Sequence, residues 1–382
     1  MRQHDRLLRI GSKLLIFTLI LSLSLPLFPA AETHDTQSAV SSETELKEII
    51  TQHEEFIEQE PTLHPMLNNL NGSNEISVIV QMSEPPVALE KGKKDIQGKS
   101  FSISEKRKVQ HKVKTQQEQF QTQLKLNGIV HKKNYSYTEA FNGVSIKLSA
   151  NEVKELLKIE GVVSVEPDLE VRALGQASQA TPGNSPMLPS SIPYLNIPAI
   201  WEMGYEGQGV KIAVLDTGID YNHPDFIGVY KGGYNFVTHD SNYARPRASN
   251  DPYETSPLDR PTSKPEINSD GISFQTSHGT HVAGIIAAQG NNNYGIKGLA
   301  PKIELYAYRV LGAYGIGTTS AIIAAIDKAV QEDMDIINLS FGGNVNSQIT
   351  ADAIAINNAV LAGVTAVIAA GNSGPTAGSI GT

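Results

Sequence analysis

The sequence contains no cysteine and a single tryptophan among its 382 residues. The absence of cysteine excludes disulfides, thiolate metal ligands and a cysteine nucleophile, so the fold has to be stabilised by packing or by bound ions. Basic residues are in the minority, 31 against 40 acidic ones, and the net charge of −9 argues against a nucleic-acid-binding protein. Long apolar runs are absent beyond Phe28, so the sequence predicts a soluble chain after that point.

The first residues have the pattern of a targeting signal. Basic residues precede an apolar run from Leu14 to Phe28, and the small residues Ala30 and Ala31 follow it. A run of this length suits a signal peptide and is short for a membrane-spanning helix, although an N-terminal anchor stays open as the alternative. We expect a signal peptide over residues 1–31 and an extracellular protein, free or associated with the cell wall, without a stable membrane anchor.

The next part of the chain divides in two. Residues 32–74 are polar and acidic without a strong period, which predicts a linker or a weakly ordered arm. Residues 75–170 predict a small α+β domain. Its expected elements are a strand at 76–81, a helix at 104–126, strands within 135–148, a helix opened by a capping box at Ser149-x-x-Glu152, and a strand at 162–165.

The composition changes again after residue 170. Residues 171–193 are rich in Ala, Ser, Gln, Pro and Gly, which predicts an exposed linker where proteolytic processing takes place. From residue 194 to 382, apolar strands alternate with helices, and this predicts an α/β domain whose parallel sheet is covered on both faces. The expected strands are 210–215, 305–310, 336–339 and 365–369, and the expected helices are 281–288, 320–331 and 351–361.

Active residues of such sheets gather at the carboxyl ends of the strands. The first strand ends in Asp216-Thr217-Gly218, and a carboxylate at that position is desolvated unless a partner satisfies it. A turn cap is one alternative. An aspartic protease is another, but it needs a second Asp-Thr/Ser-Gly, which only a homodimer could supply here, and an all-β fold.

A second candidate lies in the stretch from Ser277 to Gly284. His278 and His281 could ligate zinc, but no H-E-x-x-H pattern accompanies them. The better interpretation places His278 just before the helix with Nδ1–H held by Asp216, which leaves Nε2 free to take a proton. His281 is expected to face the helix interior and to pack there.

Four stretches then carry a resemblance to the subtilisin family of serine proteases. They occur in the family's order and are Val214–Ile219, His278–Gly284, Ile337–Gly343 and Ala369–Gly374. The resemblance implies a subtilisin-like parallel-sheet domain and serine endopeptidase activity by acyl transfer. It implies that Asp216 orients His278, that His278 is the general base, and that Asn372 donates to the oxyanion hole.

The resemblance also predicts where a peptide substrate binds. Ser340, Phe341, Gly342 and Gly343 would form one edge of a cleft in which an extended peptide lies as an added strand. Leu311–Gly317, with Gly312 and Gly315, would form the opposite edge.

Two further segments resemble parts of this family. Residues 76–170 resemble its ferredoxin-like inhibitor I9 prodomain, which implies an intramolecular inhibitor and folding chaperone that is cleaved off autocatalytically. Between Tyr234 and Thr276 lies a long polar stretch in which Asn235-Phe236-Val237 and Asp251-Pro252 resemble the minor extracellular proteases of the family.

No cofactor is expected for catalysis, but a structural Ca²⁺ is. The segment from Gly290 to Ile296 resembles the family's calcium loop. The resemblance implies ligands from the side chain of Asn292, from the carbonyl groups of Gly290, Tyr294 and Ile296, and from the carboxylate of Asp225. Oxygen-only ligation suits Ca²⁺, and an unliganded Asn-rich turn is the alternative.

The family's nucleophile motif, Gly-Thr-Ser-Met-Ala, does not occur in the 382 residues. Without a serine, Asp216 and His278 have no nucleophile to activate. We therefore expect a fragment of a longer protease that is inactive alone. The alternative is a catalytically dead product whose residues 76–170 act as a protease inhibitor or chaperone.

Overall fold

The structure is a computed structural model in which two compact units can be distinguished, residues 1–45 and residues 46–382. The predicted signal peptide lies outside the described residues. Within the described part of the chain, no helix is both long and apolar enough to cross a membrane. The described residues are 35–174, 192–237, 242–245, 247–291, 295–343, 347, 349–375 and 380.

The prediction of a weakly ordered arm at residues 32–74 is wrong for most of that segment. Asp35–Ile57 form helix α2, and strand β1 (Thr62–Leu63) and the 3₁₀ turn η1 (Pro65–Leu67) follow. The segment is rich in good helix formers such as Glu, Leu and Lys. His53 and Phe56, three residues apart on one helix face, are both buried. The burial of these two side chains depends on tertiary contacts, so the mainly polar sequence of this segment does not predict it.

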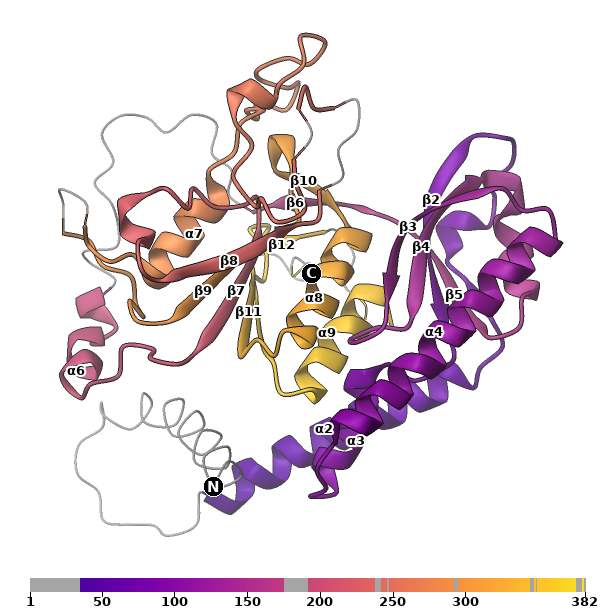
Figure 1. The fold of residues 1–382 in the computed structure, drawn as a ribbon, viewed down its shortest axis with the longest axis horizontal. Helices are drawn as coiled ribbons and strands as arrows, with labels where there is room; N and C mark the ends of the chain where they lie inside the picture. The colour runs from indigo at the N-terminus through magenta and orange to yellow at the C-terminus, as the bar shows by residue number, and fades with distance from the viewer. Residues whose placement is uncertain are drawn as a thin grey trace. The chain divides into compact units, whose positions relative to one another are not determined.

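The N-terminal domain is a five-stranded sheet in the order β1-β5-β2-β4-β3, as Figure 1 shows in purple and magenta. Its central strands are paired antiparallel, and β1 runs parallel to β5. The bounds are β2 Glu75–Met82, α3 Val87–Ile96, α4 Ile103–Leu126, β3 His131–Tyr137, β4 Gly143–Ser149, η2 Ala150–Lys158 and β5 Val162–Pro167. The α+β prediction is confirmed, and α3 is an addition to it.

The predicted capping box lies at the wrong helix. Ser149 makes no side-chain capping bond, and the segment after it is the 3₁₀ helix η2. The box forms instead at the start of α4, where the Ser102 hydroxyl accepts from the N–H of Glu105 and the Glu105 carboxylate accepts from the N–H of Ser102. Both sites carry the Ser-x-x-Glu pattern, so only the local backbone distinguishes them.

The predicted linker begins later than residue 171. Glu170–Ala173 form strand β6, which lies antiparallel between β10 (Ile316–Thr318) and β12 (Phe341–Gly342). The end of the N-terminal domain is therefore an inserted strand of a three-stranded sheet built with the C-terminal domain.

The C-terminal domain contains the predicted parallel sheet, with five strands in the order β13-β11-β7-β9-β8. All four pairings in it are parallel. The strands are β7 Lys211–Asp216, β8 Tyr230–Asn235, β9 Glu304–Arg309, β11 Ile336–Leu339 and β13 Thr365–Ile368. The helices are α6 Ile197–Glu202, η3 Pro224–Phe226, η4 Pro257–Asp259, α7 His278–Ala287, η5 Ala313–Gly315, α8 Thr319–Gln331 and α9 Ala351–Leu361.

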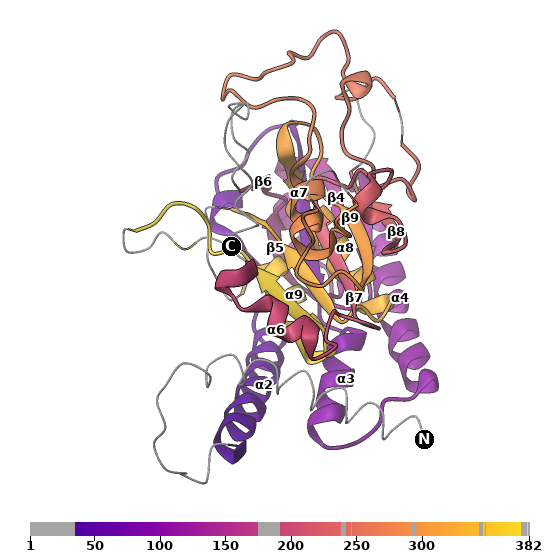
Figure 2. The same ribbon diagram turned by 90° about the vertical axis from the view of Figure 1, so that its left-hand side faces the viewer.

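Helices cover both faces of this sheet. Along β7, Ala213 and Leu215 belong to the core cluster shared with α8 and α9, whereas Ile212 and Val214 belong to the cluster shared with α7. This alternation is what a strand with two buried faces requires. Figures 1 and 2 show α7 on one side of the sheet and α8 and α9 on the other.

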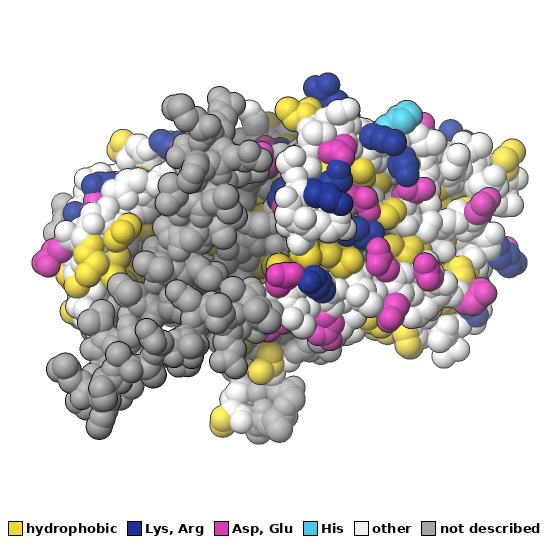
Figure 3. Space-filling view, turned by 90° about the horizontal axis from the view of Figure 1, so that it is seen from below, with side chains coloured by type: hydrophobic (Ala, Val, Ile, Leu, Met, Phe, Trp, Pro, Cys, Tyr) yellow, Lys and Arg dark blue, Asp and Glu magenta, His cyan; other side chains and the backbone are white. Residues whose placement is uncertain are grey.

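The face seen from below in Figure 3 carries described side chains of both charge signs, interspersed with hydrophobic ones. Charged side chains of opposite sign also pair between and within neighbouring helices. Lys93 of α3, for example, lies 2.8 Å from Glu54 of α2 and 3.0 Å from Glu90 within α3. Such half-exposed pairs stabilise a surface only weakly.

Candidate active site

Asp216 and His278 are brought into direct contact. Asp216 is the last residue of β7 and is fully buried, and its Oδ1 lies 2.8 Å from Nδ1 of His278. The N–H of Thr217 also donates to Oδ1, at 2.6 Å. The helix predicted at 281–288 begins earlier, at His278. His278 is therefore its first residue and does not stand before it, as predicted.

A close approach of α7 to the end of β7 makes this contact geometrically feasible. Gly279 donates its N–H to the hydroxyl of Thr217 at 2.8 Å. A Cβ atom on Gly279 would lie only 2.2 Å from the carbonyl oxygen of Gly218 and 3.1 Å from Cβ of Asp216. No other residue can occupy this position without moving the helix, and with it His278, away from Asp216.

The other ring nitrogen of His278 meets the N-terminal domain's own chain. Nε2 lies 2.9 Å from the carbonyl oxygen of Leu174, the residue after β6. Both nitrogens therefore face oxygens that only accept, and the two bonds form together only when the ring is protonated. Burial acts to lower the pKa of His278, but the hydrogen bond and charge of Asp216, with the Leu174 carbonyl and the charge of Glu254, outweigh it and raise the pKa.

The cleft predicted for an extended peptide is filled by β6. Phe341 and Gly342 pair with β6 on one side, and the N–H of Leu174 donates to the carbonyl oxygen of Ser340 at 3.2 Å. On the other side, β6 pairs with Ile316–Thr318. Gly343 follows β12 directly. The chain thus supplies the added strand itself.

Of the predicted edge Leu311–Gly317, Ile316 and Gly317 pair with β6, whereas Gly312 and Gly315 do not. They form the turn before β10, in which Gly312 donates to Ile316 and Gly315 donates to Gly312. A Cβ atom on Gly312 would lie 1.9 Å from the hydroxyl oxygen of Tyr243. A glycine at position 312 lets Tyr243 of the Tyr234–Thr276 stretch approach the turn. The edge of the cleft is formed by Ile316–Thr318.

Two other predicted residues, Asn372 and His281, lie outside the contact between Asp216 and His278. Asn372 follows β13 at the same edge of the sheet as Asp216, is exposed, and makes no hydrogen bond within the described part of the chain. His281 is exposed on α7, so the expectation that it packs in the helix interior is wrong.

The proposed calcium ligands are described only in part, since Asn292 and Tyr294 lie outside the described residues. Asp225 is buried, and its Oδ1 accepts from the N–H of Asn291 at 2.6 Å. Its carbonyl oxygen accepts from Gln289 at 3.0 Å, which brings the loop that contains Gly290 and Ile296 beside this carboxylate. The ligands implied for the ion are carboxylate and carbonyl oxygens, which are the kind of donor that Ca²⁺ takes. Among the described residues, no group of three or more His, Cys, Asp or Glu could hold a metal.

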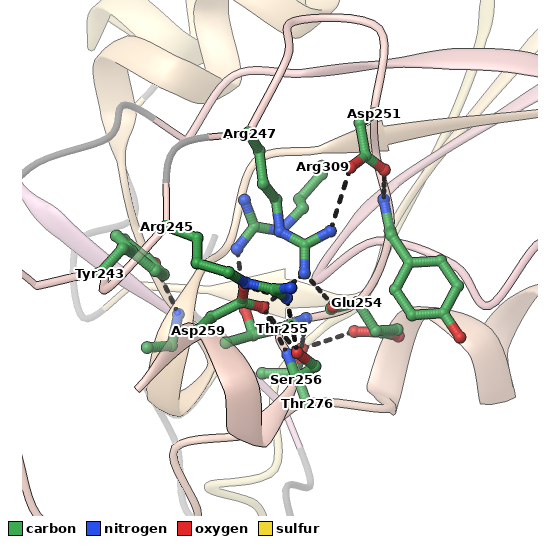
Figure 4. Close-up of polar contacts among 12 residues, drawn as sticks. Tyr243, Arg245, Arg247, Asp251, Glu254, Thr255, Ser256, Asp259, Thr276 and Arg309 are labelled. Carbon is green, nitrogen blue, oxygen red and sulfur yellow. Dashed lines mark hydrogen bonds and ion pairs between the residues drawn. The ribbon is translucent and has the colours of Figure 1, made fainter. Parts of the chain in front are cut away.

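A polar network in the Tyr234–Thr276 stretch was missed by sequence reasoning. Figure 4 shows that Arg245 and Arg247 of this stretch contact the carboxylates of Asp259 and Asp251. Arg247 also donates to the carbonyl oxygen of Glu254, and Arg309 of β9 donates to Thr255. Arg309 is buried at the carboxyl end of β9, where the rule on strand ends could have flagged it. Glu254 carries no motif, so no local signal in the sequence marks it.

Carboxylates also join the two domains. Asp327 of α8 accepts from the N–H groups of Thr138, Glu139 and Ala140, at 3.1, 2.7 and 2.8 Å. Burial raises the pKa of Asp327 to about 7, although these bonds partly oppose the shift.

Two helices of the C-terminal domain are capped from the N-terminal domain. Asp168 accepts from the N–H and the hydroxyl of Ser320 at the start of α8, at 2.8 and 2.7 Å. Glu166 accepts from the N–H of Ala351, the first residue of α9, at 3.2 Å. Helix N-termini attract negative charge, so these contacts orient the domains.

Comparison with protein families gives two matches. Residues 77–174 match the model described as "Peptidase inhibitor I9", and residues 207–382 match the model described as "Subtilase family". The first match ends at the residue whose carbonyl group contacts His278.

Among curated proteins, the chain is similar to "Minor extracellular protease Vpr" of Bacillus subtilis (strain 168), with 37% identity over 320 residues that cover 82% of this chain and 35% of that protein. It is 37% identical over 233 residues to "Subtilisin E" of the same organism, covering 61% of this chain and 50% of that protein. It is 40% identical over 187 residues to "Subtilisin" of Bacillus pumilus, covering 49% of this chain and 56% of that protein. The chain therefore spans about a third to about half of the length of these relatives.

Proposed function

Because this chain belongs to the subtilase family and carries an inhibitor I9 domain ahead of its subtilase domain, we propose that it is part of the precursor of a secreted serine endopeptidase. The observation that carries this proposal is the 2.8 Å contact between Asp216 Oδ1 and His278 Nδ1 at the end of a buried parallel strand. Its substrates are extracellular proteins and peptides that bind as an added strand.

The chemistry follows from that contact. Asp216 holds the ring with Nδ1 protonated, so that Nε2 of the neutral ring takes the proton of a serine hydroxyl as this attacks the peptide carbonyl. The same Nε2 then returns the proton to the leaving amine. Asn372 donates its side-chain amide to the developing oxyanion. The nucleophile is a serine of the family's Gly-Thr-Ser-Met-Ala motif, which is not among the 382 residues.

We further propose that the I9 domain inhibits the subtilase domain from within the same chain. β6 occupies the cleft in which a substrate strand would lie, and Leu174 donates its N–H to Ser340 while its carbonyl group contacts His278. A protonated His278 cannot act as a base, so the arrangement is an inhibited one. The peptide bond after Leu174 is the processing site that this geometry favours.

The proposal is tested with the protein that the gene encodes and with the 382-residue chain beside it. The protein that includes the serine motif is expected to hydrolyse peptides, to be blocked by a serine-directed reagent, and to lose turnover on His278→Ala. The 382-residue chain is expected to show no turnover. Turnover by the 382-residue chain that is lost on His278→Ala would overturn the account of the nucleophile.

A structural Ca²⁺ at Asp225 and the loop 290–296 is also proposed, in a stabilising role outside the chemistry. Oxygen ligands and a buried carboxylate beside the loop support it. Export through the predicted signal peptide completes the proposal, in keeping with the extracellular relative.

A further inference from the structure

Glu254 is a buried carboxylate whose partners all donate. The residue is only 5% exposed to solvent. Oε1 accepts from the N–H and from the hydroxyl of Thr280, at 2.9 and 3.0 Å, and Oε2 accepts from the hydroxyl of Thr276 at 2.6 Å. Burial raises the pKa of Glu254, whereas these bonds favour the charged form and lower it in part. An isolated charge at this depth would be costly, so the three bonds explain how it is kept there.

One of these bonds completes the first turn of the helix that carries His278. Thr280 is the third residue of α7, and its N–H is one that no bond within the helix can satisfy. The residue that precedes the helix, Ser277, makes no side-chain capping bond. Glu254 therefore caps α7 from a distant part of the chain, and its charge lies at the end of the helix that favours a negative charge.

The threonine hydroxyls extend the contact to the strand that ends in Asp216. Thr280 Oγ1 donates to Glu254 and accepts from the N–H of Asp220, at 2.8 Å. Asp220 lies in the turn after β7. The carboxylate thus joins the beginning of α7 to the segment after Asp216, the two places whose separation sets the contact between Asp216 and His278.

The backbone around Glu254 is anchored as well, as Figure 4 shows. Arg247 donates to the Glu254 carbonyl oxygen at 2.9 Å. Arg309 donates to the hydroxyl of Thr255 at 2.8 Å and to Asn235 at 2.8 Å, so it ties this segment to the ends of β8 and β9. Because both the backbone and the carboxylate of Glu254 are held by hydrogen bonds, Glu254 can hold the start of α7 in place.

We propose that Glu254 is a positioning residue of the candidate active site, whose carboxylate caps α7 and so holds the His278 ring against Asp216. It does not touch the reacting atoms and acts through Thr280 and α7. This inference rests on the proposed function, because the orientation of His278 matters to turnover only if His278 is the base. Removing the cap is expected to loosen the first turn of α7 and to weaken the Asp216 contact.

The first test uses the 382-residue chain and needs no turnover. NMR of the His278 ring gives its pKa and the resonance of the hydrogen-bonded Nδ1 proton. In Glu254→Gln we expect the His278 pKa to fall, partly through loss of the Glu254 charge alone. We also expect a weaker or exchange-broadened Nδ1 proton, which reports the lost cap. In Glu254→Asp, which keeps the charge and can still accept hydrogen bonds, we expect much of both to be restored.

The matched control is Asp335→Asn. Asp335 is a half-buried carboxylate that accepts from the N–H of Lys211 at 3.0 Å, at the opposite end of β7 from Asp216. This variant is expected to lose stability and to leave the His278 resonances unchanged. If Glu254→Gln leaves them unchanged too, or if Glu254→Asp behaves as the Gln variant does, Glu254 is only a structural residue and the proposal is overturned.

A second measurement keeps the test valid if the Gln variant does not fold. In the wild-type chain with ¹³C-labelled Glu, titration of the Glu254 carboxyl is expected to shift the His278 Nδ1 proton at the same pH. Independent titration of the two groups contradicts the proposal.

Kinetics of the protein that includes the serine motif distinguish the role of Glu254 from the proposed function. There, Glu254→Gln is expected to lower kcat by about 10–100-fold with little change in KM, because misplacement of a catalytic group acts on the chemical step. An unchanged kcat overturns the role of Glu254 and leaves the proposed function intact. A wild-type protein without turnover overturns the proposed function, and the NMR titration still decides on Glu254.

Discussion

Nε2 of His278 lies 2.9 Å from the carbonyl oxygen of Leu174, while Nδ1 of the same ring lies 2.8 Å from Asp216. One imidazole is thus held between a carboxylate of the subtilase domain and the chain that leaves the I9 domain. The contact joins the protonation of one ring to the docking of β6.

Docking of β6 is expected to weaken as the pH rises. The pKa of His278 is raised in the docked state despite burial, through Asp216 and the Leu174 carbonyl. A raised pKa contributes stability that is complete below the ordinary value of about 6.5 and is lost as the pH rises through the raised value. Hydrogen exchange of the β6 amides between pH 6 and 9, corrected for intrinsic rates, measures it. His278→Ala should remove this part of the dependence, and protection that grows with pH would contradict the prediction.

The contact of Asp327 with the I9 domain is expected to depend more on its acceptor oxygen Oδ1 than on the negative charge of the carboxylate. Oδ1 accepts from Glu139 and Ala140 at 2.7 and 2.8 Å, and Asp327→Ala would leave these buried N–H groups unpaired. We expect a loss of about 2–3 kcal/mol, or roughly 30–150-fold in affinity of the separated I9 domain. Asp327→Asn keeps an acceptor oxygen and should lose much less.

The same two variants test a second pH effect. Burial raises the pKa of Asp327 and of Glu166 to about 7 each. Stability from these groups is present below their unfolded pKa of about 4 and is lost as the pH rises to about 7. The Asn variant, which cannot titrate, should show a flatter pH profile of binding between pH 4 and 7. An unaltered profile would show that Asp327 does not contribute.

Two glycines of α7 should respond in opposite ways to alanine. Gly279→Ala places a Cβ atom 2.2 Å from the Gly218 carbonyl oxygen, so we expect a loss of about 1–3 kcal/mol in unfolding free energy and a disturbed His278 Nδ1 proton. At Gly284 a Cβ atom would meet nothing within 4 Å, and Gly284→Ala should stabilise the helix by about 0.5–1 kcal/mol. Denaturant unfolding and NMR measure both, and equal effects would argue against the close approach.

Arg172 and Asp270 should affect docking only slightly. Arg172 on β6 lies 3.1 Å from Asp270 in the Tyr234–Thr276 stretch, but the side chains are 46% and 54% exposed. An exposed pair is worth about 0.2–1 kcal/mol, so Asp270→Arg should weaken binding of the I9 domain about two- to fivefold at low salt and hardly at 1 M. Arg172→Asp combined with Asp270→Arg should restore it. A large effect that salt does not screen would rule out a surface ion pair.

Calcium should stabilise the wild-type chain. If Asp225 and the neighbouring loop bind Ca²⁺, the thermal midpoint should rise with Ca²⁺ and fall in a chelator, because a ligand of the folded state alone stabilises it. Asp225→Asn should abolish the difference. Asp333→Asn is the control, since Asp333 is an exposed residue with φ 53°, a conformation that Asn tolerates. The absence of any calcium effect in the wild type would disprove the proposed ion.

Regular periodic segments were predicted well. The helix expected at 104–126 runs from Ile103 to Leu126, and the strand expected at 210–215 runs from Lys211 to Asp216. Helix α2 was missed because His53 and Phe56 are the only buried residues among its described side chains. Strand β6 was missed because its partners, β10 and β12, lie well over a hundred residues later in the chain.

By itself, the sequence determined the order of the two domains, the parallel sheet and the strand-end motif that contains Asp216, because each depends on local patterns of apolar and polar residues. Tertiary structure alone decided that Leu174 meets His278, that Glu254 caps α7, and that Gly312 makes room for Tyr243. These contacts join residues that are between 26 and 104 positions apart in the sequence. Their energies come from burial and from paired hydrogen bonds, which exist only after the chain has folded.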